Sequence, residues 1–137
     1  ISTRVLSDMG FTVYSIEAHK EYIEALDNVT SYHVPLAKEN NVQWYDTKIL
    51  QEILENLNYD IVIVDGPRGS EGRSNMVYYT QLFDLSATFI VDDCEREADN
   101  SIFESIKQRK ETLYKTSVEV IKDNYNGHTK ITKILTL

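Results

Sequence analysis

The sequence predicts a single α/β domain built on a mostly parallel, twisted sheet with an antiparallel hairpin at its C-terminal end. Three observations lead to this prediction. Segments typical of strands alternate with segments typical of helices. Two of the strands are continuous apolar runs, which is typical of strands covered on both faces. The turn Asn126-Gly127 separates two further strand-like segments, which is a strong hairpin signal.

The composition is that of an ordinary globular chain. The protein has 137 residues, of which 42% are hydrophobic and 26% charged, and this is sufficient for one domain, 1–137, with its own core. The net charge of −8 disfavours nucleic acid and membrane surfaces as partners, because both are anionic. The single cysteine, Cys94, excludes an internal disulfide framework, and a cytoplasmic location is the default expectation. We expect a small-molecule partner, and the sequence gives no indication of the oligomeric state.

The first half of the chain is expected to alternate between helices and strands. Ser2 or Thr3 is a suitable cap for a first helix. The clearest helix covers 46–58, where apolar residues recur at helical spacing behind a capping Asp46 or Thr47. The other elements expected here are a strand at 12–17, a helix at 19–26 and a strand at 29–36.

The second half continues the alternation and ends in the hairpin. Residues 60–65 and 87–93 are the two apolar strands, and both end on carboxylates. The second arm of the hairpin does not alternate cleanly, which indicates a bulge. Because the chain opens on a helix, we expect a strand before Ile1 to be missing. The helices and hairpin arms expected here are 74–85, 100–113, 116–123 and 128–137.

Acidic residues follow three of the predicted strands, at Glu17, at Asp65, and at Asp92 with Asp93. Ligands of open α/β sheets bind beyond the C-terminal ends of the strands, and charge placed there is costly unless something binds it. Each acid alone is equally well explained as a helix cap or a strand end. Their shared position at one edge favours a site. An acid after the second strand can accept both hydroxyls of a ribose, and this role is available to Glu17.

Three short segments carry a resemblance to a known family. WYD at 44–46, VDGPRG at 64–69 and DDCERE at 92–97 resemble a bacterial group of class I S-adenosylmethionine-dependent methyltransferases, including polysaccharide-modifying enzymes such as the glucuronoxylan 4-O-methyltransferases. The acidic strand ends also resemble metal-dependent O-methyltransferases related to catechol methyltransferase. The resemblance covers nearly the whole chain. It implies a three-layer, Rossmann-like methyltransferase fold whose first strand and glycine-rich loop lie upstream of Ile1.

The resemblance also implies S-adenosylmethionine as cofactor. By position, Glu17 would bind the ribose hydroxyls, and Ser2 and Thr3 would lie near the methionine carboxylate. Asp65 would face the sulfonium end of the cofactor or a metal. The full set of implied cofactor-binding residues is Ser2, Thr3, Glu17, Ala18, Leu36 and Asp65, with Ala18 and Leu36 as neighbours of the adenine.

Methylation of a hydroxyl requires a base or a metal that makes the oxygen nucleophilic. Asp65, Asp92 and Asp93 are the candidate catalytic residues for this step. They can act as general bases, or they can supply oxygen ligands to Mg²⁺ or Mn²⁺. Asp92-Asp93 can also be a plain strand end in which Asp93 caps a turn.

The expected acceptor is a hydroxyl of a small molecule or a saccharide. An acidic acceptor would suit Arg68, Arg73 and Arg96, because arginine binds carboxylates in two-point geometry. The competing interpretation pairs these arginines with glutamates on solvated loops, namely Glu71, Glu95 and Glu97. Trp44 and Tyr45 either border a ligand pocket or pack before the helix.

The predicted function is therefore that of an S-adenosylmethionine-dependent methyltransferase. Two other functions remain open. One is a non-catalytic binding module that keeps the fold, and the other is a nicotinamide-dependent Rossmann enzyme. The second requires a G-x-G-x-x-G turn and a sheet that ends in parallel strands, and the predicted hairpin argues against it.

Overall fold

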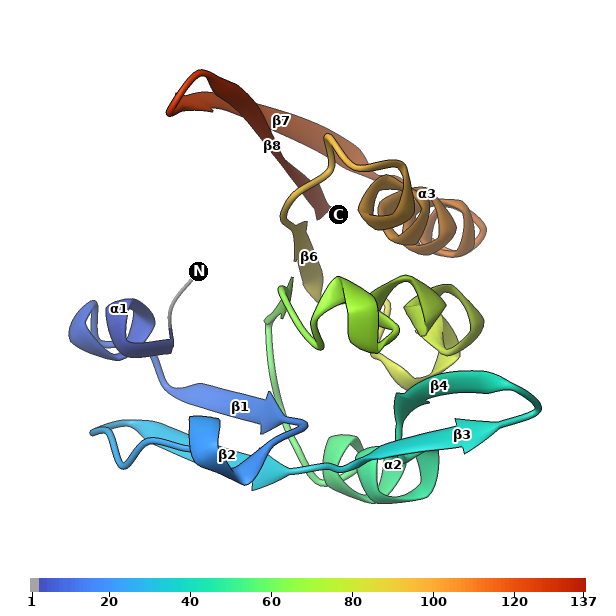
Figure 1. The fold of residues 1–137 in the computed structure, drawn as a ribbon. Helices are drawn as coiled ribbons and strands as arrows, with labels where there is room; N and C mark the ends of the chain where they lie inside the picture. Colours follow the sequence, from blue (N-terminus) through green and yellow to red (C-terminus); the bar gives the residue numbers. More distant parts are fainter. Residues whose placement is uncertain (1–2) are drawn as a thin grey trace.

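A computed structural model of the protein describes residues 3–137, in which short sheets of mixed strand orientation are joined by helices (Figure 1). β1 (Val13–Glu17) pairs in parallel with β2 (Val29–His33). β3 (Leu36–Glu39) and β4 (Val42–Tyr45) form an antiparallel hairpin. Each of these two sheets has two strands.

The third sheet has four strands in the order β5-β6-β8-β7. β5 and β6 are parallel to each other, whereas β8 runs antiparallel to both of its neighbours. Figure 1 shows the β7-β8 hairpin extending away from the body of the molecule. The bounds are β5 (Ile61–Val64), β6 (Thr88–Val91), β7 (Ser117–Tyr125) and β8 (His128–Thr136).

The predicted Rossmann-like fold with a mostly parallel sheet is wrong. Within residues 3–137, parallel pairing is confined to β1-β2 and β5-β6, and these pairs belong to separate sheets. The prediction treated every strand–helix–strand succession as a crossover within one sheet. Alternation along the chain specifies neither the sheet that a strand joins nor its neighbour, so this step had no physical support.

Part of the error in the predicted fold concerns the helices. α1 (Thr3–Asp8), α2 (Thr47–Leu54) and α3 (Glu97–Glu111) lie where helices were predicted, with shorter or shifted bounds. The predicted helix at 19–26 is only the 3-10 turn η1, and that at 74–85 is broken into η3 and η4. β-Branched and aromatic residues, which are weak helix formers, interrupt the second of these segments. The 3-10 segments are η1 (Lys20–Tyr22), η2 (Gly69–Glu71), η3 (Arg73–Tyr78) and η4 (Thr80–Leu82).

Local signals are confirmed at the start of α2 and at the terminal hairpin. The side chain of Asp46 accepts hydrogen bonds from the amides of Lys48 and Ile49, each at 3.1 Å, so Asp46 is the cap. Asn126 and Gly127 adopt φ of 49° and 78° at the hairpin turn, as their sequence predicts. The arms pair one to one from Ser117–Thr136 to Tyr125–His128, so the predicted bulge is wrong.

The hydrophobic core lies around Trp44 and the parallel strands β5 and β6. Trp44 is 2% exposed, and its ring stacks on Tyr79 at 4.8 Å with an interplanar angle of 3°. Of the two interpretations of this aromatic residue, the packing role is therefore the one observed. None of the helices within residues 3–137 has the length and apolarity that crossing a bilayer requires.

Gly72 is expected to tolerate no side chain. Its φ is 101°, and an added Cβ would lie 2.2 Å from the carbonyl oxygen of Gln43. The substitution Gly72→Ala should lower the free energy of unfolding by at least ~2 kcal/mol, because both the backbone conformation and the contact oppose it. Gly69→Ala is the matched control, since a Cβ there meets nothing within 4 Å. Denaturant unfolding measures both, and equal effects would contradict this explanation.

Candidate functional site

A buried arginine joins the carboxylates that follow β5 and β6. The side chain of Arg73 is 9% exposed, and its Nη1 lies 3.3 Å from Asp93 Oδ2 and 3.3 Å from Asp99 Oδ1. Its Nη2 lies 3.8 Å from Asp65 Oδ1. The Nε of Arg73 donates to the carbonyl of Pro67 at 2.9 Å. One guanidinium thus connects the loops after two strands with the first turn of α3.

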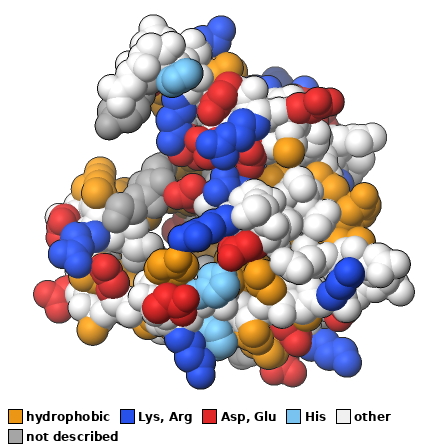
Figure 2. All heavy atoms as spheres, in the orientation of Figure 1, with side chains coloured by type: hydrophobic (Ala, Val, Ile, Leu, Met, Phe, Trp, Pro, Cys, Tyr) orange, Lys and Arg blue, Asp and Glu red, His pale blue; other side chains and the backbone are white. Residues whose placement is uncertain are grey.

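Two further cations complete what we call the Arg73 cluster. Lys130 Nζ, from β8, lies 2.7 Å from Asp92 Oδ2 and 3.5 Å from Asp93 Oδ1. Arg96 Nη1 lies 3.1 Å from Asp93 Oδ2, and Thr132 donates to Asp92 at 2.6 Å. Figure 2 shows basic and acidic side chains gathered in the middle of one face of the molecule. Two of the predicted strand-end sites, Asp65 and Asp92-Asp93, are therefore close together. The predicted shared edge is wrong for Glu17, because β1 belongs to a different sheet from β5 and β6.

Burial and hydrogen bonding act in opposite directions on the aspartates of this cluster. At Asp99, burial is the larger effect and raises the pKa above its ordinary value, although Arg73 opposes the shift. At Asp92, burial also favours the neutral form. Hydrogen bonds from Lys130 and Thr132 outweigh it, and the pKa lies below its ordinary value. Asp92 is consequently an ionised, firmly held carboxylate.

The cluster does not fit Mg²⁺ or Mn²⁺. No group of three or more His, Cys, Asp or Glu side chains within residues 3–137 is placed to hold an ion. Asp92 and Asp93 already face the cations Lys130, Arg73 and Arg96, which would repel a divalent ion brought to the same oxygens.

The three arginines predicted to bind an acceptor are engaged within the protein. Arg73 and Arg96 pair with aspartates rather than with the glutamates considered above. Arg68 donates to the hydroxyl of Tyr22, and its guanidinium lies 5.3 Å from the centre of the Tyr22 ring. An acceptor would have to compete with these contacts.

A second contact joins the segment after β1, which contains Tyr22, to the loop after β5, which contains Arg68. His19 Nε2 lies 2.8 Å from Glu71 Oε1, and this hydrogen bond holds the pKa of Glu71 below its ordinary value. The His19 and Tyr22 rings meet edge to face at 5.8 Å. We call the pairs His19–Glu71 and Tyr22–Arg68 the clasp. It fastens the segment after β1 to the loop after β5.

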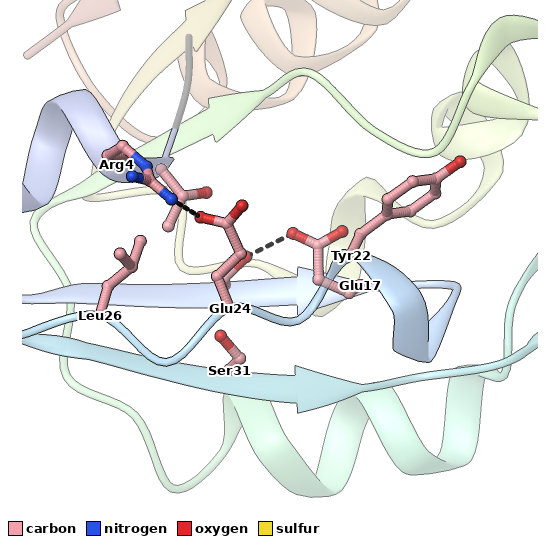
Figure 3. Close-up of a pocket in the computed structure, with 8 residues that line it drawn as sticks. Arg4, Glu17, Tyr22, Glu24, Leu26 and Ser31 are labelled. Carbon is pink, nitrogen blue, oxygen red and sulfur yellow. Dashed lines mark hydrogen bonds and ion pairs between the residues drawn. The ribbon is translucent and has the colours of Figure 1, made fainter.

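A polar pocket of about 160 Å³ opens beside Glu17 (Figure 3). Ser15 Oγ donates to Glu17 Oε1 at 2.6 Å. Among residues 3–137, this is the hydrogen bond made by the Glu17 carboxylate. Arg4 Nη2 and Glu24 Oε2 are 3.0 Å apart on the same pocket. The lining residues are Thr3, Arg4, Ser15, Glu17, Tyr22, Glu24, Leu26 and Ser31.

The pocket brings together only part of the predicted cofactor set. Thr3 and Glu17 line it. Ala18 and Leu36 pack against the hydrophobic core. Neither they nor Asp65 are among the lining residues. Ser2 lies outside the described residues. Ser15 and Ser31 were missed, although Ser15 stands two residues before Glu17, so strand alternation places both on one face.

Tyr45 brings the end of β1 close to the loop after β5. Its hydroxyl donates to the carbonyl of Ile16 at 3.3 Å and would lie 3.2 Å from a Cβ on Gly66. Burial raises the pKa of Tyr45, and the negative charges of Glu17 and Glu71 raise it further. Tyr45 therefore links the Glu17 pocket to the VDGPRG segment.

The chain was compared with known proteins at the level of sequence. No protein-family model matches it, and a search of the curated proteins also finds no match.

Removing the buried guanidinium should be far more damaging than removing an exposed one. Arg73→Met leaves Asp93 and Asp99 without their buried partner, and we expect it to lower the free energy of unfolding by about 3–5 kcal/mol. Arg96→Met is the matched control, because Arg96 contacts the same two aspartates with a side chain that is 56% exposed. Arg96→Met should lower the free energy of unfolding by less than about 1 kcal/mol. A similar loss for both variants, in denaturant unfolding, would contradict the central role of Arg73.

Tyr45 should make the protein less stable at alkaline pH. Because its pKa is raised on folding, the folded state retains a proton that the unfolded chain loses above about pH 10. This contribution is complete below that pH and falls by up to ~1.4 kcal/mol per unit above it. The substitution Tyr45→Phe removes this pH-dependent contribution to stability. The stability difference between the native protein and the variant, measured by denaturant unfolding from neutral to alkaline pH, should therefore shrink as pH rises, and a constant difference would contradict the assignment.

Proposed function

We propose that this chain binds S-adenosylmethionine through its ribose at Glu17 and serves methyl transfer to a hydroxyl of a small molecule or a saccharide. The observation that carries the proposal is the carboxylate of Glu17, which is oriented by Ser15 in a polar pocket. Carboxylates accept strong hydrogen bonds from hydroxyl groups, since a charged acceptor makes stronger hydrogen bonds than a neutral one.

The size and charge of the pocket support a sugar carried by a cationic ligand. Its volume of about 160 Å³ lies below the roughly 300–1,000 Å³ of pockets that enclose a whole drug-sized ligand. It suits the sugar part of the cofactor, and the rest of the cofactor would extend beyond it. Two carboxylates, Glu17 and Glu24, face one guanidinium, Arg4, so the local charge favours a cation such as a sulfonium.

Asp65 is the residue that we assign as general base. S-Adenosylmethionine would supply an activated methyl group. Asp65 would take the proton of the acceptor hydroxyl as its oxygen attacks the methyl carbon, and the sulfur would retain the electron pair of the broken bond. The assignment rests on access, because the side chain of Asp65 is 43% exposed, against 5% for Asp92 and 14% for Asp93.

A non-catalytic binding module is the second candidate function. It is favoured by the ion pairs of Asp92 and Asp93, which commit these predicted catalytic residues to Lys130, Arg73 and Arg96. Both candidate functions use the same pocket, and only the methyltransferase would transfer a methyl group. For either, we propose a cytoplasmic location, the default for a chain whose one cysteine, Cys94, leaves no internal disulfide to form.

The cofactor proposal is tested by calorimetric titration with S-adenosylhomocysteine. Glu17→Gln should weaken binding by about 10- to 100-fold, because it removes a charged hydrogen-bond acceptor of about 1.5–3 kcal/mol. Glu119→Gln makes the same change in charge at an exposed site on β7 and should leave the affinity unchanged. Equal affinities for all three proteins would remove Glu17 from the site. Binding without methyl transfer to any hydroxyl acceptor would favour the non-catalytic module.

A further inference from the structure

The two serines of the pocket stand side by side on neighbouring strands. Ser15 on β1 and Ser31 on β2 are partners in the parallel register, and such neighbours point to the same face of a sheet with the strands about 4.8 Å apart. Both line the pocket. Glu17, two residues after Ser15, projects from the same face of β1. Two hydroxyls and one carboxylate therefore share one small polar surface.

The two serine hydroxyls have different roles available to them. Ser15 is 8% exposed, and its proton is committed to Glu17 Oε1 at 2.6 Å. This bond fixes the direction of the carboxylate. Within the part of the chain that the structure describes, Ser31 makes no side-chain hydrogen bond, and it is only partly buried. Its hydroxyl can therefore donate to a ligand or accept from one.

We propose that Ser31 is a specificity-determining residue that selects a vicinal diol, with Ser15 as the residue that positions Glu17. One hydroxyl of the diol donates to Glu17, and the adjacent hydroxyl meets Ser31. The inference rests on the proposed function and deepens it, because it assigns the recognition of ribose over deoxyribose to two named serines. A ligand that lacks one of the two hydroxyls leaves either the carboxylate or Ser31 without its partner, and this is the basis of strong discrimination by polar sites.

The test compares adenosine, 2′-deoxyadenosine and 3′-deoxyadenosine by calorimetric or competition titration against S-adenosylhomocysteine. The native protein should prefer adenosine by about tenfold or more over at least one of the deoxynucleosides. Ser31→Ala should bring the preference close to unity over one of the two deoxynucleosides, the one that lacks the hydroxyl meeting Ser31. The preference that Glu17 provides over the other should be retained, and thermal unfolding should stay unchanged. Ser117→Ala, on the outer strand β7, is the control and should keep the native preference.

The role of Ser15 is tested by rescue. Ser15→Ala should weaken adenosine binding by about tenfold, whereas Ser15→Thr retains the hydroxyl and should restore most of the affinity. A purely structural role would make the larger threonine the worse of the two variants at this buried position.

The possible failures are distinguishable. If the native protein binds S-adenosylhomocysteine but Ser31→Ala keeps the full preference for adenosine, the diol inference is overturned and the proposed function stands. If neither S-adenosylhomocysteine nor adenosine binds to the native protein, both are overturned together.

Discussion

The buried guanidinium of Arg73 is the interaction on which the geometry of the site depends. A buried cation is tolerated only where partners satisfy it, and the partners of Arg73 come from separate segments. Asp93 and Asp99 belong to the loop after β6 and to α3, while Pro67 offers its carbonyl from the loop after β5. Because the fork of donors is rigid, these contacts determine where the loop after β5 runs.

That loop in turn determines one wall of the Glu17 pocket. Arg68 and Glu71 hold Tyr22 and His19 through the clasp, and Tyr22 is itself a lining residue. The Arg73 cluster and the pocket are therefore connected through a short series of contacts. A change at Arg73 has a physical route to ligand binding that requires no direct contact with the ligand.

Sequence reasoning was sufficient where a segment determines its own structure. The cap at Asp46 and the turn at Asn126-Gly127 are local, since the residues that make the contacts are neighbours in the chain. Reasoning failed where the outcome depends on a distant partner. No spacing encodes the pairing of Lys130 with Asp92, because it depends on which strand β8 joins. The hairpin of β3 and β4 was missed although its turn, Asn40-Asn41, adopts φ of 50° and 67°, a conformation that asparagine tolerates.

In the candidate site too, the local features were predicted from sequence and the contacts with distant residues were not. Acids after buried strands identified Glu17, Asp65 and the Asp92-Asp93 pair from sequence, and the cluster does contain the last two groups. The cations that neutralise them were not visible, because an arginine in a loop has the same local signature whether it binds a ligand or an aspartate. Ser31 likewise becomes meaningful only once the register places it beside Ser15.

The neutralising cations also decide which aspartate can take part in chemistry. Asp92 is nearly inaccessible and held by Lys130, and Asp93 faces Arg73, Arg96 and Lys130 together. A general base has to reach the proton that it removes, and neither side chain is placed to do so. Asp65 lies at the outer side of the same guanidinium, at 3.8 Å and with 43% of its side chain exposed. For the proposed methyl transfer, an acceptor hydroxyl would therefore have to reach Asp65, whereas the proposed cofactor binding would require only the pocket beside Glu17.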